Sequence, residues 1–226
     1  MNEIALLSIL FDYPEYHQPL FLNNALKYFK KDQIFVARFN NLVQGSYYDK
    51  LYQYKIVHLY NYIKENLLNY KYILFGDAKD TNFYKDPSNI INDFNSYNCN
   101  IVFCAEINLW PAIDQSHLYD SKPKNSAYRY LNSGLYFGYT EHILKHLENI
   151  IKEDRQPYDD QAQWAIEYLI SDDIKLDQDR KMFFSTLEAK SDVIVEGNKY
   201  TISTNPYMVH DNGPYNDNTI KISYNI

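Results

Sequence analysis

The sequence predicts an α/β fold with a mixed, mostly parallel central sheet, and it predicts that residues 1–226 form a single domain. Short apolar runs alternate along the chain with longer segments in which apolar residues recur at helical spacing. Two of these runs end in acidic residues, a pattern typical of ligand sites at the ends of central strands. A chain of 226 residues with 46% hydrophobic content also has the size and apolar content of one such domain.

The first third of the chain predicts a strand, a helix, a second strand and a long helix. Glu3–Phe11 is a short apolar run, and the apolar residues between Pro14 and Phe29 have helical spacing. Ile34–Phe39 predicts the second strand. Leu51–Leu68 keeps apolar residues at helical intervals over its whole length and predicts the long helix.

Two central strands follow, and acidic residues lie at or just beyond their carboxyl ends. Tyr72–Phe75 is followed by Asp77 and Asp80, and Ile101–Ala105 is followed by Glu106. Ligands of open α/β sheets bind beyond the carboxyl ends of the strands. We therefore expect the functional site at this edge of the sheet.

The remaining elements alternate between helix and strand. Pro87–Phe94 predicts a helix with Ser88 as its N-cap. Arg129–Tyr139 is an apolar segment that carries an Asn-Ser-Gly turn. Glu141–Lys152 and Asp159–Ile170 predict two further helices, and the C-terminal part predicts strands and loops.

Charge and apolar patterning argue against nucleic-acid binding, a membrane span and a signal peptide. The net charge of −7 and the pI of about 5.3 oppose nucleic-acid binding, because phosphate contacts need a basic face. The chain has no apolar run of about 18 residues, which excludes a membrane span. The run Ile4–Phe11 follows Glu3 and lacks a basic flank and a cleavage site, so it does not resemble a signal peptide. We expect a soluble protein that acts in a cytoplasm.

Asp77 and Asp80 are candidates for binding a divalent cation. They lie three residues apart directly after a buried strand, and a tight turn there would direct both carboxylates to one hard cation. Such a cation would neutralise the negative charge that builds on a departing nucleoside diphosphate. Taken alone, an Asp-x-x-Asp pair after a strand is more often an ordinary solvated turn.

Three further groups have both a functional and a structural explanation. His210, before a Gly-Pro turn, is a candidate third metal ligand, although a lone histidine is more often structural or exposed. Asp159 and Asp160 begin a helix, where acids stabilise the helix dipole without any catalytic role. Trp110, followed by a proline, is compatible with simple core or turn packing.

Five segments taken in order form a pattern that is more specific than any one of them. They are Leu74–Asp80, Phe103–Pro111, Tyr130–Gly134, Asp159–Gln161 and Val209–Pro214. This ordered set resembles the glycosyltransferase domain of the procollagen lysyl hydroxylases, over a stretch from about Lys55 to Pro214.

The resemblance implies a GT-A-type, Rossmann-like glycosyltransferase fold. It implies a UDP-sugar donor bound with Mn²⁺, or with Mg²⁺ in its place, and transfer of glucose or galactose to a hydroxylysine-linked acceptor in collagen-like chains. In this sequence Asp77 and Asp80 match the metal-binding acids of the family, and His210 matches its histidine ligand.

The resemblance also implies residues on the donor and sugar sides of the site. Asp159 and Asp160, followed by Gln161, match the acidic segment that would orient the transferred sugar or the acceptor hydroxyl. The residues that match the pocket for sugar and diphosphate are Lys55, Trp110, Asn132, Asn212 and Gly213.

Two departures from the family concern the donor. Between its metal acids the family has an aromatic residue that stacks on uracil, whereas this chain has Lys79. After Gly213 and Pro214 the family has a nearby lysine for phosphate, whereas the next lysine here is Lys221, and Lys79 would compensate as a donor contact. The hydroxylase part of the family has no counterpart in this sequence, which predicts a stand-alone transferase.

Three alternatives for the function remain open. A transferase of the same fold would act on an unrelated glycan, with acceptor choice in loops such as Asp114–Ala127. A non-catalytic nucleotide-sugar-binding module would keep the cation site without turnover. An unrelated acidic structural protein would show no Mn²⁺-dependent thermal shift. The sequence does not predict the oligomeric state.

Overall fold

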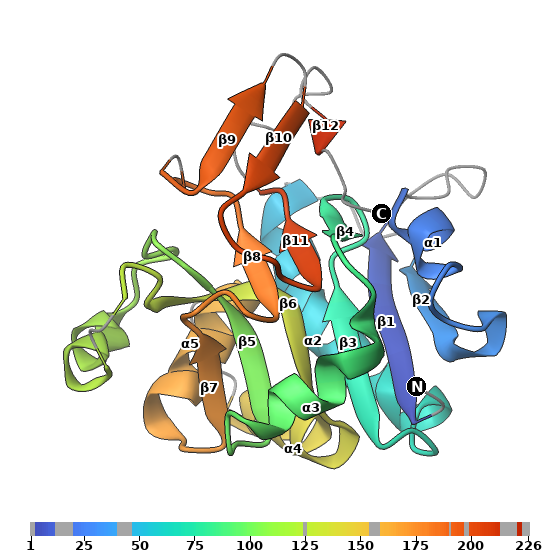
Figure 1. Ribbon diagram of the computed structural model, residues 1–226. Coiled ribbons are helices and arrows are strands. Elements are labelled where there is room, and N and C mark those ends of the chain that lie inside the picture. The colour runs from blue at the N-terminus through green and yellow to red at the C-terminus, as the bar shows by residue number, and fades with distance from the viewer. Residues whose placement is uncertain are drawn as a thin grey trace.

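The chain forms a six-stranded central sheet with other elements on both of its faces (Figure 1). The computed structural model describes residues 3–11, 20–39, 47–123, 126–153, 159–189, 191–196, 199–212 and 221–222. The strand order is β2-β1-β3-β6-β5-β7. These strands are β1 (Ile4–Phe11), β2 (Ile34–Phe39), β3 (Tyr72–Gly76), β5 (Ile101–Glu106), β6 (Tyr130–Tyr139) and β7 (Ile174–Asp177).

Strand β6 makes the sheet mixed. β1 pairs in parallel with β2 and β3, and β5 pairs in parallel with β7, whereas β6 is antiparallel to both of its neighbours, β3 and β5. The prediction of a mixed, mostly parallel sheet is therefore confirmed. Since β3 and β5 flank β6 and run in the same direction, their carboxyl ends lie at the same edge of the sheet.

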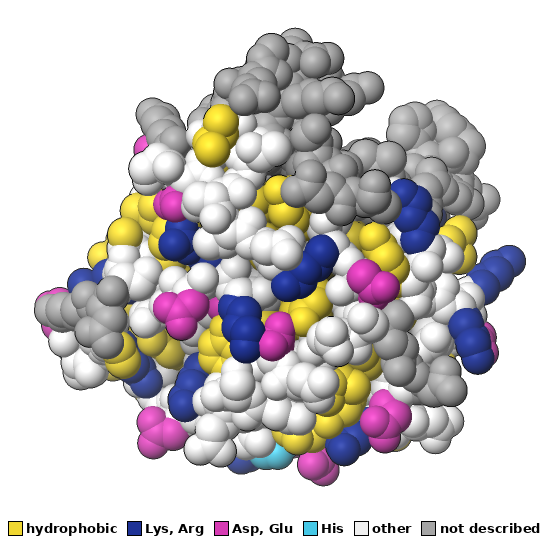
Figure 2. All heavy atoms as spheres, viewed as in Figure 1, with side chains coloured by type: hydrophobic (Ala, Val, Ile, Leu, Met, Phe, Trp, Pro, Cys, Tyr) yellow, Lys and Arg dark blue, Asp and Glu magenta, His cyan; other side chains and the backbone are white. Residues whose placement is uncertain are grey.

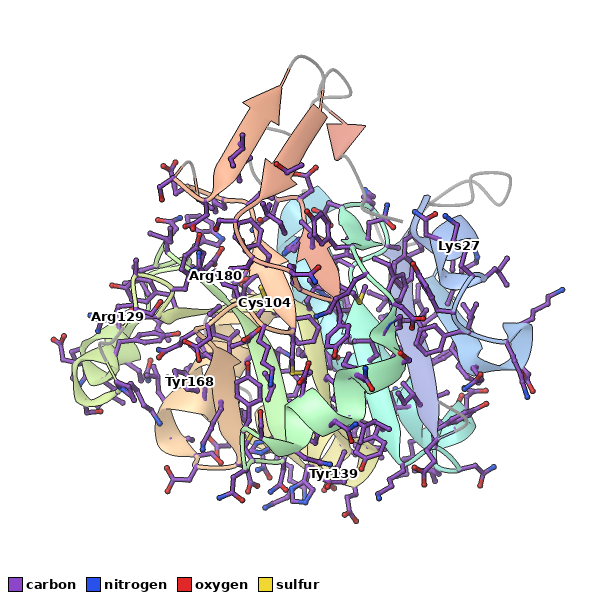
Figure 3. All side chains as sticks on the ribbon, viewed as in Figure 1. Lys27, Cys104, Arg129, Tyr139, Tyr168 and Arg180 are labelled. Atoms are coloured by element: carbon purple, nitrogen blue, oxygen red, sulfur yellow. The ribbon has the colours of Figure 1, made fainter. Side chains whose placement is uncertain are left out.

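Each face of the sheet has its own apolar core, because successive residues of a strand point to opposite faces. On β3, Ile73 and Phe75 belong to one core, and Tyr72 and Leu74 belong to the other. Cys104 on β5 belongs to the second core and is fully buried beneath β8 (Figure 3). The first core includes residues of α2 (Tyr47–Asn66), α4 (Thr140–Glu153) and α5 (Asp160–Ile170), and the second includes residues of α1 (Leu20–Ala25) and α3 (Ile90–Asn95).

Two smaller sheets are formed within the described residues. One has the order β4-β11-β8 and joins the segment after β3 to the C-terminal part of the chain, and the other has the order β12-β10-β9. Their strands are β4 (Thr81–Phe83), β8 (Phe183–Ser185), β9 (Val193–Glu196), β10 (Lys199–Ile202), β11 (Met208–His210) and β12 (Lys221–Ile222). The 3-10 helices are η1 (Lys31–Gln33), η2 (Pro87–Asn89) and η3 (Asp114–Ser121).

The predicted helix Pro87–Phe94 is wrong in its first turn and in its cap. The first turn is the 3-10 helix η2, and α3 begins only at Ile90. The N-cap is Asp86, whose Oδ1 accepts a hydrogen bond from the Ser88 backbone N–H at 2.8 Å. Proline has no backbone N–H to cap, so the Asp86 carboxylate bonds the residue after it, and Ser88 receives the cap instead of providing it.

The predicted Asn-Ser-Gly turn is also wrong, because Asn132–Gly134 lies inside the continuous strand β6. The register between β5 and β6 shifts there: Cys104 pairs with Asn132, whereas Phe103 pairs with Tyr136. The extra residues of β6 therefore form an irregularity of the bulge type, in which residues suited to turns are also common.

Charged side chains of both signs are scattered over one face of the molecule (Figure 2). On the face shown in Figure 2, Lys and Arg side chains lie among Asp and Glu, and no single basic patch stands out. None of the helices in the described part of the chain has the length and apolar character needed to cross a membrane.

Candidate active site

A cavity of about 390 Å³ opens where β3, β5 and β6 meet the start of α5 and the strand β11. Of the predicted site residues that are described, only Lys79 is not among the residues lining it, and the Lys79 side chain is exposed. Gly213 lies outside the described residues. The described residues that line the cavity are Lys55, Asp77, Asp80, Glu106, Asn108, Trp110, Asn132, Ser133, Gly134, Asp159, Asp160, Gln161, Leu187, His210 and Asn212.

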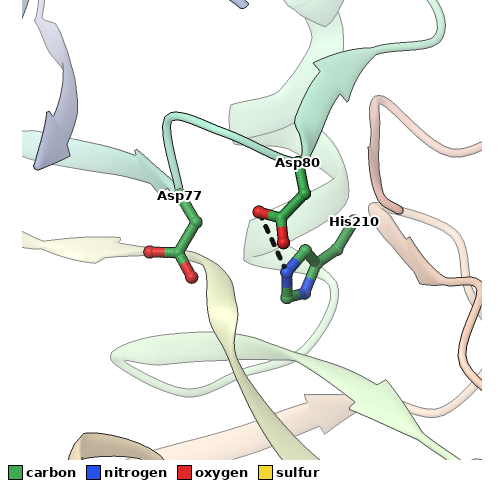
Figure 4. A group of neighbouring side chains, drawn as sticks. All are labelled: Asp77, Asp80 and His210. Atoms are coloured by element: carbon green, nitrogen blue, oxygen red, sulfur yellow. Dashed lines mark ion pairs between the residues drawn. The ribbon is translucent and has the colours of Figure 1, made fainter. Parts of the chain in front are cut away.

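Asp77, Asp80 and His210 form a compact group (Figure 4). One potential ligand atom from each lies within 4.8 Å of the other two, and His210 Nε2 is 3.4 Å from Asp80 Oδ1. Asp77 follows β3, and Asp80 lies next to Thr81, the first residue of β4. Because β11 pairs with β4 so that His210 is opposite Thr81, the C-terminal histidine comes to lie beside the two acids.

The hydrogen bonds of Asn132 fix the orientation of the His210 ring. Asn132 Nδ2 donates to Glu106 Oε2 at 3.2 Å, and Asn132 Oδ1 accepts from the Gly134 backbone N–H at 3.0 Å. The amide oxygen therefore faces His210 Nδ1, which is 2.7 Å away, and Nδ1 must carry the proton. Nε2 is therefore the ring nitrogen that faces Asp80, and its lone pair would be available to a cation once Nε2 has lost its proton.

This donor set fits a divalent cation such as Mn²⁺ or Mg²⁺. Two carboxylates and one imidazole offer oxygen and nitrogen ligands, and an imidazole whose other nitrogen donates to a fixed acceptor is the usual arrangement of a metal-binding histidine. Burial lowers the pKa of His210, but Asp80, Asp77 and Glu106 outweigh it, so the pKa is raised. The three carboxylates thus favour positive charge at the ring position.

Gly134 clears the space that the His210 ring occupies. A Cβ atom at position 134 would lie 2.2 Å from Cε1, 2.4 Å from Nδ1 and 2.8 Å from Nε2 of His210. No side chain other than hydrogen fits there without moving the ring. The glycine of the Asn-Ser-Gly segment is thus required by a close approach and not by a turn.

We expect Gly134→Ala to weaken Mn²⁺ binding by at least about tenfold, because losing the support of a metal-ligating histidine typically costs that much affinity. Gly138→Ala is the matched control, since its Cβ would also clash, at 2.7 Å from the Asn100 carbonyl oxygen, but far from His210. Both variants should lose thermal stability, and only Gly134→Ala should lose the Mn²⁺-dependent thermal shift. A folded Gly134→Ala protein that binds Mn²⁺ like the wild type would contradict this role.

Lys55 on α2 joins the cation group to the acids of α5. Its Nζ is 3.0 Å from Asp77 Oδ1 and 2.9 Å from Asp160 Oδ2, and only 7% of the residue is exposed. Burial lowers the pKa of Lys55, but Asp160 and Asp77 outweigh burial and raise it. Burial raises the pKa of Asp77, and Lys55 opposes that effect. Lys55 is therefore a permanent positive charge between the two carboxylates.

The two acids at the start of α5 differ in what they contact. Asp159 is the N-cap, and its Oδ1 accepts a hydrogen bond from the Ala162 backbone N–H at 3.1 Å. Asp160 is 3% exposed, and its Oδ2 accepts a hydrogen bond from Ser133 Oγ at 2.9 Å in addition to its ion pair with Lys55. Burial, followed by the charge of Asp160, raises the pKa of Asp159 to about 6. Asp159 thus has the structural role expected of an acid at a helix start, while both acids line the cavity.

Glu106 is the acid for which the sequence predicted no role. It is 1% exposed and accepts hydrogen bonds from Asn132 Nδ2 at 3.2 Å, Gln161 Nε2 at 2.7 Å and Asn212 Nδ2 at 3.4 Å. Burial raises its pKa to about 7, although these hydrogen bonds and His210 favour the carboxylate. The one available sequence signal was its position at the end of β5, the edge where Asp77 follows β3.

Gln161 connects Glu106 to the loop that carries Trp110. Gln161 Nε2 also donates to the Trp110 carbonyl oxygen at 2.6 Å, and Gln161 Oε1 accepts from the Ser133 backbone N–H at 3.1 Å. Trp110 itself is 61% exposed, so it does not pack in the core. Its large apolar surface lies at the rim of the cavity, which excludes the core-packing alternative for this residue.

We expect Glu106→Gln to flatten the pH dependence of the free energy of unfolding between about pH 4.5 and about pH 7. The folded pKa of Glu106 is raised from 4.5 to about 7, so in this window the folded state keeps a proton that the unfolded state has lost. The wild-type free energy of unfolding should therefore fall as pH rises, by about 3 kcal/mol from this residue. Glu106→Gln should lack that part of the fall.

Urea unfolding at pH 4.5 and pH 7.5, with a chelator present, measures this difference for each protein. Glu65→Gln, which changes an exposed glutamate of α2, is the control and should behave like the wild type. The same pH dependence in Glu106→Gln and the wild type would be incompatible with a raised pKa at position 106.

The fold is similar to that of a solved glycosyltransferase. The structure matches a solved glycosyltransferase "involved in the glycosylation of the major capsid of PBCV-1" with a TM-score of 0.57, over 96% of each chain and at 12% sequence identity. At that identity the likeness concerns the fold, which is consistent with the predicted GT-A-type architecture.

The sequence then defines the family. Residues 52–224 match the family model described as the PLOD GT domain, and the chain belongs to this family of glycosyltransferase domains. The predicted resemblance to the procollagen lysyl hydroxylase glycosyltransferase domain is confirmed.

Three relatives illustrate the family. An uncharacterized protein of Acanthamoeba polyphaga mimivirus is 31% identical over 156 residues, which cover 66% of this chain and 33% of that protein. The multifunctional procollagen lysine hydroxylase and glycosyltransferase of Caenorhabditis elegans is 31% identical over 63% of this chain and 21% of that protein. The procollagen-lysine,2-oxoglutarate 5-dioxygenase 2 of Mus musculus is 30% identical over 63% of this chain and 20% of that protein. The match thus spans between a fifth and a third of the length of these relatives.

Proposed function

We propose that this chain transfers a hexose, glucose or galactose, from a UDP-sugar to a hydroxylysine-linked or other glycan acceptor, with Mn²⁺ or Mg²⁺ as cofactor. One observation carries the proposal: in a member of this glycosyltransferase family, two carboxylates and an oriented imidazole lie in the same cavity as the acidic start of α5. The first group suits a cation bound to a diphosphate, and the second suits a sugar.

Asp77, Asp80 and His210 hold the cation in this proposal. When bound, the cation supplies positive charge that neutralises the leaving diphosphate. Asn132 keeps the His210 ring in place, and Asn212 faces the same cavity from the residues after β11. Lys79, on the loop between the two acids, is the candidate phosphate contact in this proposal although it is not among the residues that line the cavity. The role of Gly213, which lies outside the described residues, stays a prediction.

The acids of α5 lie on the sugar side of the site in this proposal. Asp160 is held by Lys55 and Ser133, so it presents a fixed acceptor to a sugar hydroxyl. Asp159 is partly exposed to the cavity and orients the acceptor hydroxyl. The Trp110 ring offers an apolar face on which a sugar ring can pack, and Gln161 holds its loop in position.

The names of the relatives support two kinds of acceptor. The nematode relative is a procollagen lysine hydroxylase and glycosyltransferase, which favours a hydroxylysine-linked acceptor in a collagen-like chain. The structural neighbour acts in capsid glycosylation, and this favours an unrelated glycan as the second candidate. A nucleotide-sugar-binding module without turnover is the third, and it would keep the same cation group.

We expect Mn²⁺-dependent release of UDP from one member of a panel of UDP-sugars, and we expect Asp77→Ala, Asp80→Ala to abolish it. The double variant removes two of the three candidate ligands, so both cation binding and turnover should disappear. Asp172→Ala, Asp179→Ala removes two exposed acids outside the cavity and is the charge-matched control. Binding of UDP without turnover of any donor would favour the binding module.

We expect Asp159→Ala to have a free energy of unfolding about 1 kcal/mol lower than Asp159→Ser, because serine can cap α5 and alanine cannot. Comparing the two variants leaves out the effect of losing the carboxylate, whose pKa burial raises to about 6. Both variants should lower kcat/KM for transfer to an acceptor if the carboxylate orients the acceptor hydroxyl. Full activity in Asp159→Ser would show that Asp159 acts only as the N-cap of α5 and does not orient the acceptor.

A further inference from the structure

Lys55 forms an ion pair with one of the carboxylate oxygens that the candidate cation group offers, Asp77 Oδ1. Its ammonium is 3.0 Å from Asp77 Oδ1 and 2.9 Å from Asp160 Oδ2, and its side chain is 9% exposed. The same ammonium lies over the Phe75 ring, 5.4 Å from the ring centre. A buried lysine with two carboxylate partners has no low-energy position elsewhere, so it stays beside Asp77 when a cation approaches.

A cation bound by Asp77 therefore has a fixed positive charge as a close neighbour. Like charges repel more strongly where burial reduces screening by water, as it does around the 9% exposed Lys55 side chain. The attraction of Asp77 is already partly neutralised by Lys55, so the group holds a cation less tightly than its two carboxylates and one imidazole suggest. A nucleoside diphosphate reverses this balance, because its negative charges attract both the cation and the ammonium.

We propose that Lys55 makes cation binding conditional on the nucleoside diphosphate: it lowers the affinity of Asp77, Asp80 and His210 for a divalent cation until a diphosphate binds beside them. This inference rests on the proposed function for the identity of the diphosphate. Linkage requires the reverse effect as well, so the cation raises the affinity for the nucleotide by the same factor. Lys55 is in this respect a positioning residue that couples two ligands.

The pairing with Asp160 extends the coupling to the sugar side. The Lys55 ammonium stays in place, but a diphosphate beside it would share its charge, so less of that charge would compensate Asp160 Oδ2, which also accepts a hydrogen bond from Ser133 Oγ. Asp160 is then a stronger acceptor for a hydroxyl group. Binding of the donor diphosphate and the strength of Asp160 as a hydrogen-bond acceptor thus both depend on the Lys55 side chain.

Titration of Mn²⁺, followed by the electron paramagnetic resonance signal of the free ion, tests the proposal on the full chain with and without UDP. In the wild type UDP should tighten Mn²⁺ binding by at least about tenfold, within the usual range of coupling between sites. Lys55→Met should bind Mn²⁺ at least about tenfold more tightly than the wild type without UDP, and UDP should then tighten binding by a smaller factor than in the wild type. Lys64→Met, which removes an exposed lysine of the same helix, should match the wild type.

Two further variants keep the test decisive if Lys55→Met is unstable. Lys55→Met, Asp160→Asn removes one of the two carboxylates that would otherwise remain unpaired, and it should also bind Mn²⁺ more tightly than the wild type. Lys55→Arg keeps the charge and should keep the weak binding without UDP. A folded Lys55→Met or double variant whose Mn²⁺ affinity is unchanged or weaker than wild type overturns the proposal.

The outcome is separable from that of the proposed function. If no UDP-sugar is turned over but Lys55→Met still tightens Mn²⁺ binding, the transferase activity fails and the role of Lys55 stands. If UDP is released from a donor but Lys55→Met leaves Mn²⁺ affinity unchanged, the role of Lys55 fails and the transferase stands. If Asp77→Ala, Asp80→Ala binds Mn²⁺ like the wild type, the cation group itself is wrong, and both proposals are overturned.

Discussion

The hydrogen bond between His210 Nδ1 and Asn132 Oδ1 connects two parts of the chain that are 78 residues apart. His210 lies on the short strand β11, whereas Asn132 lies on β6, the antiparallel strand between β3 and β5. The contact is possible only because Gly134 has no side chain. Since the Asn132 amide also donates to Glu106, the ring and that carboxylate are fixed together. The cation group and the buried Glu106 network are therefore one structural unit.

Three acids of the cavity differ in pKa because they differ in partners. Burial raises the pKa of Asp77, Asp80 and Glu106, but His210 outweighs burial at Asp80, whose pKa is lowered. Lys55 reduces the effect of burial at Asp77 without cancelling it. Glu106 has amide donors but no ion pair, and its pKa reaches about 7. Of these three acids Asp80 is thus the most readily ionised, and it lies on the side of the cavity where β4 and β11 pair.

The sheet could be predicted from the sequence because its central strands β3 and β5 are buried on both faces and appear as short apolar runs. The predictions that failed concern sequence patterns that occur in more than one kind of local structure. Asn-Ser-Gly suits a turn and an irregular strand equally well, and only the pairing of β5 with β6 distinguishes the two. The cap at Asp86 was missed because the helix was expected to begin with its α-helical turn. That residues 1–226 form one domain stays a prediction.

The candidate site could be predicted only as far as local motifs extend. Asp77 and Asp80 share one loop, and family resemblance added the distant His210. The partners of Glu106, in contrast, lie 26, 55 and 106 residues away along the chain, at Asn132, Gln161 and Asn212. No local pattern brings three amides onto one carboxylate, because their convergence depends on the packing of β6, α5 and the residues after β11. In the sequence, such a network is indicated only by its acid at the end of a central strand. Because a buried carboxylate needs hydrogen-bond donors, that acid shows where the donors from distant segments must converge.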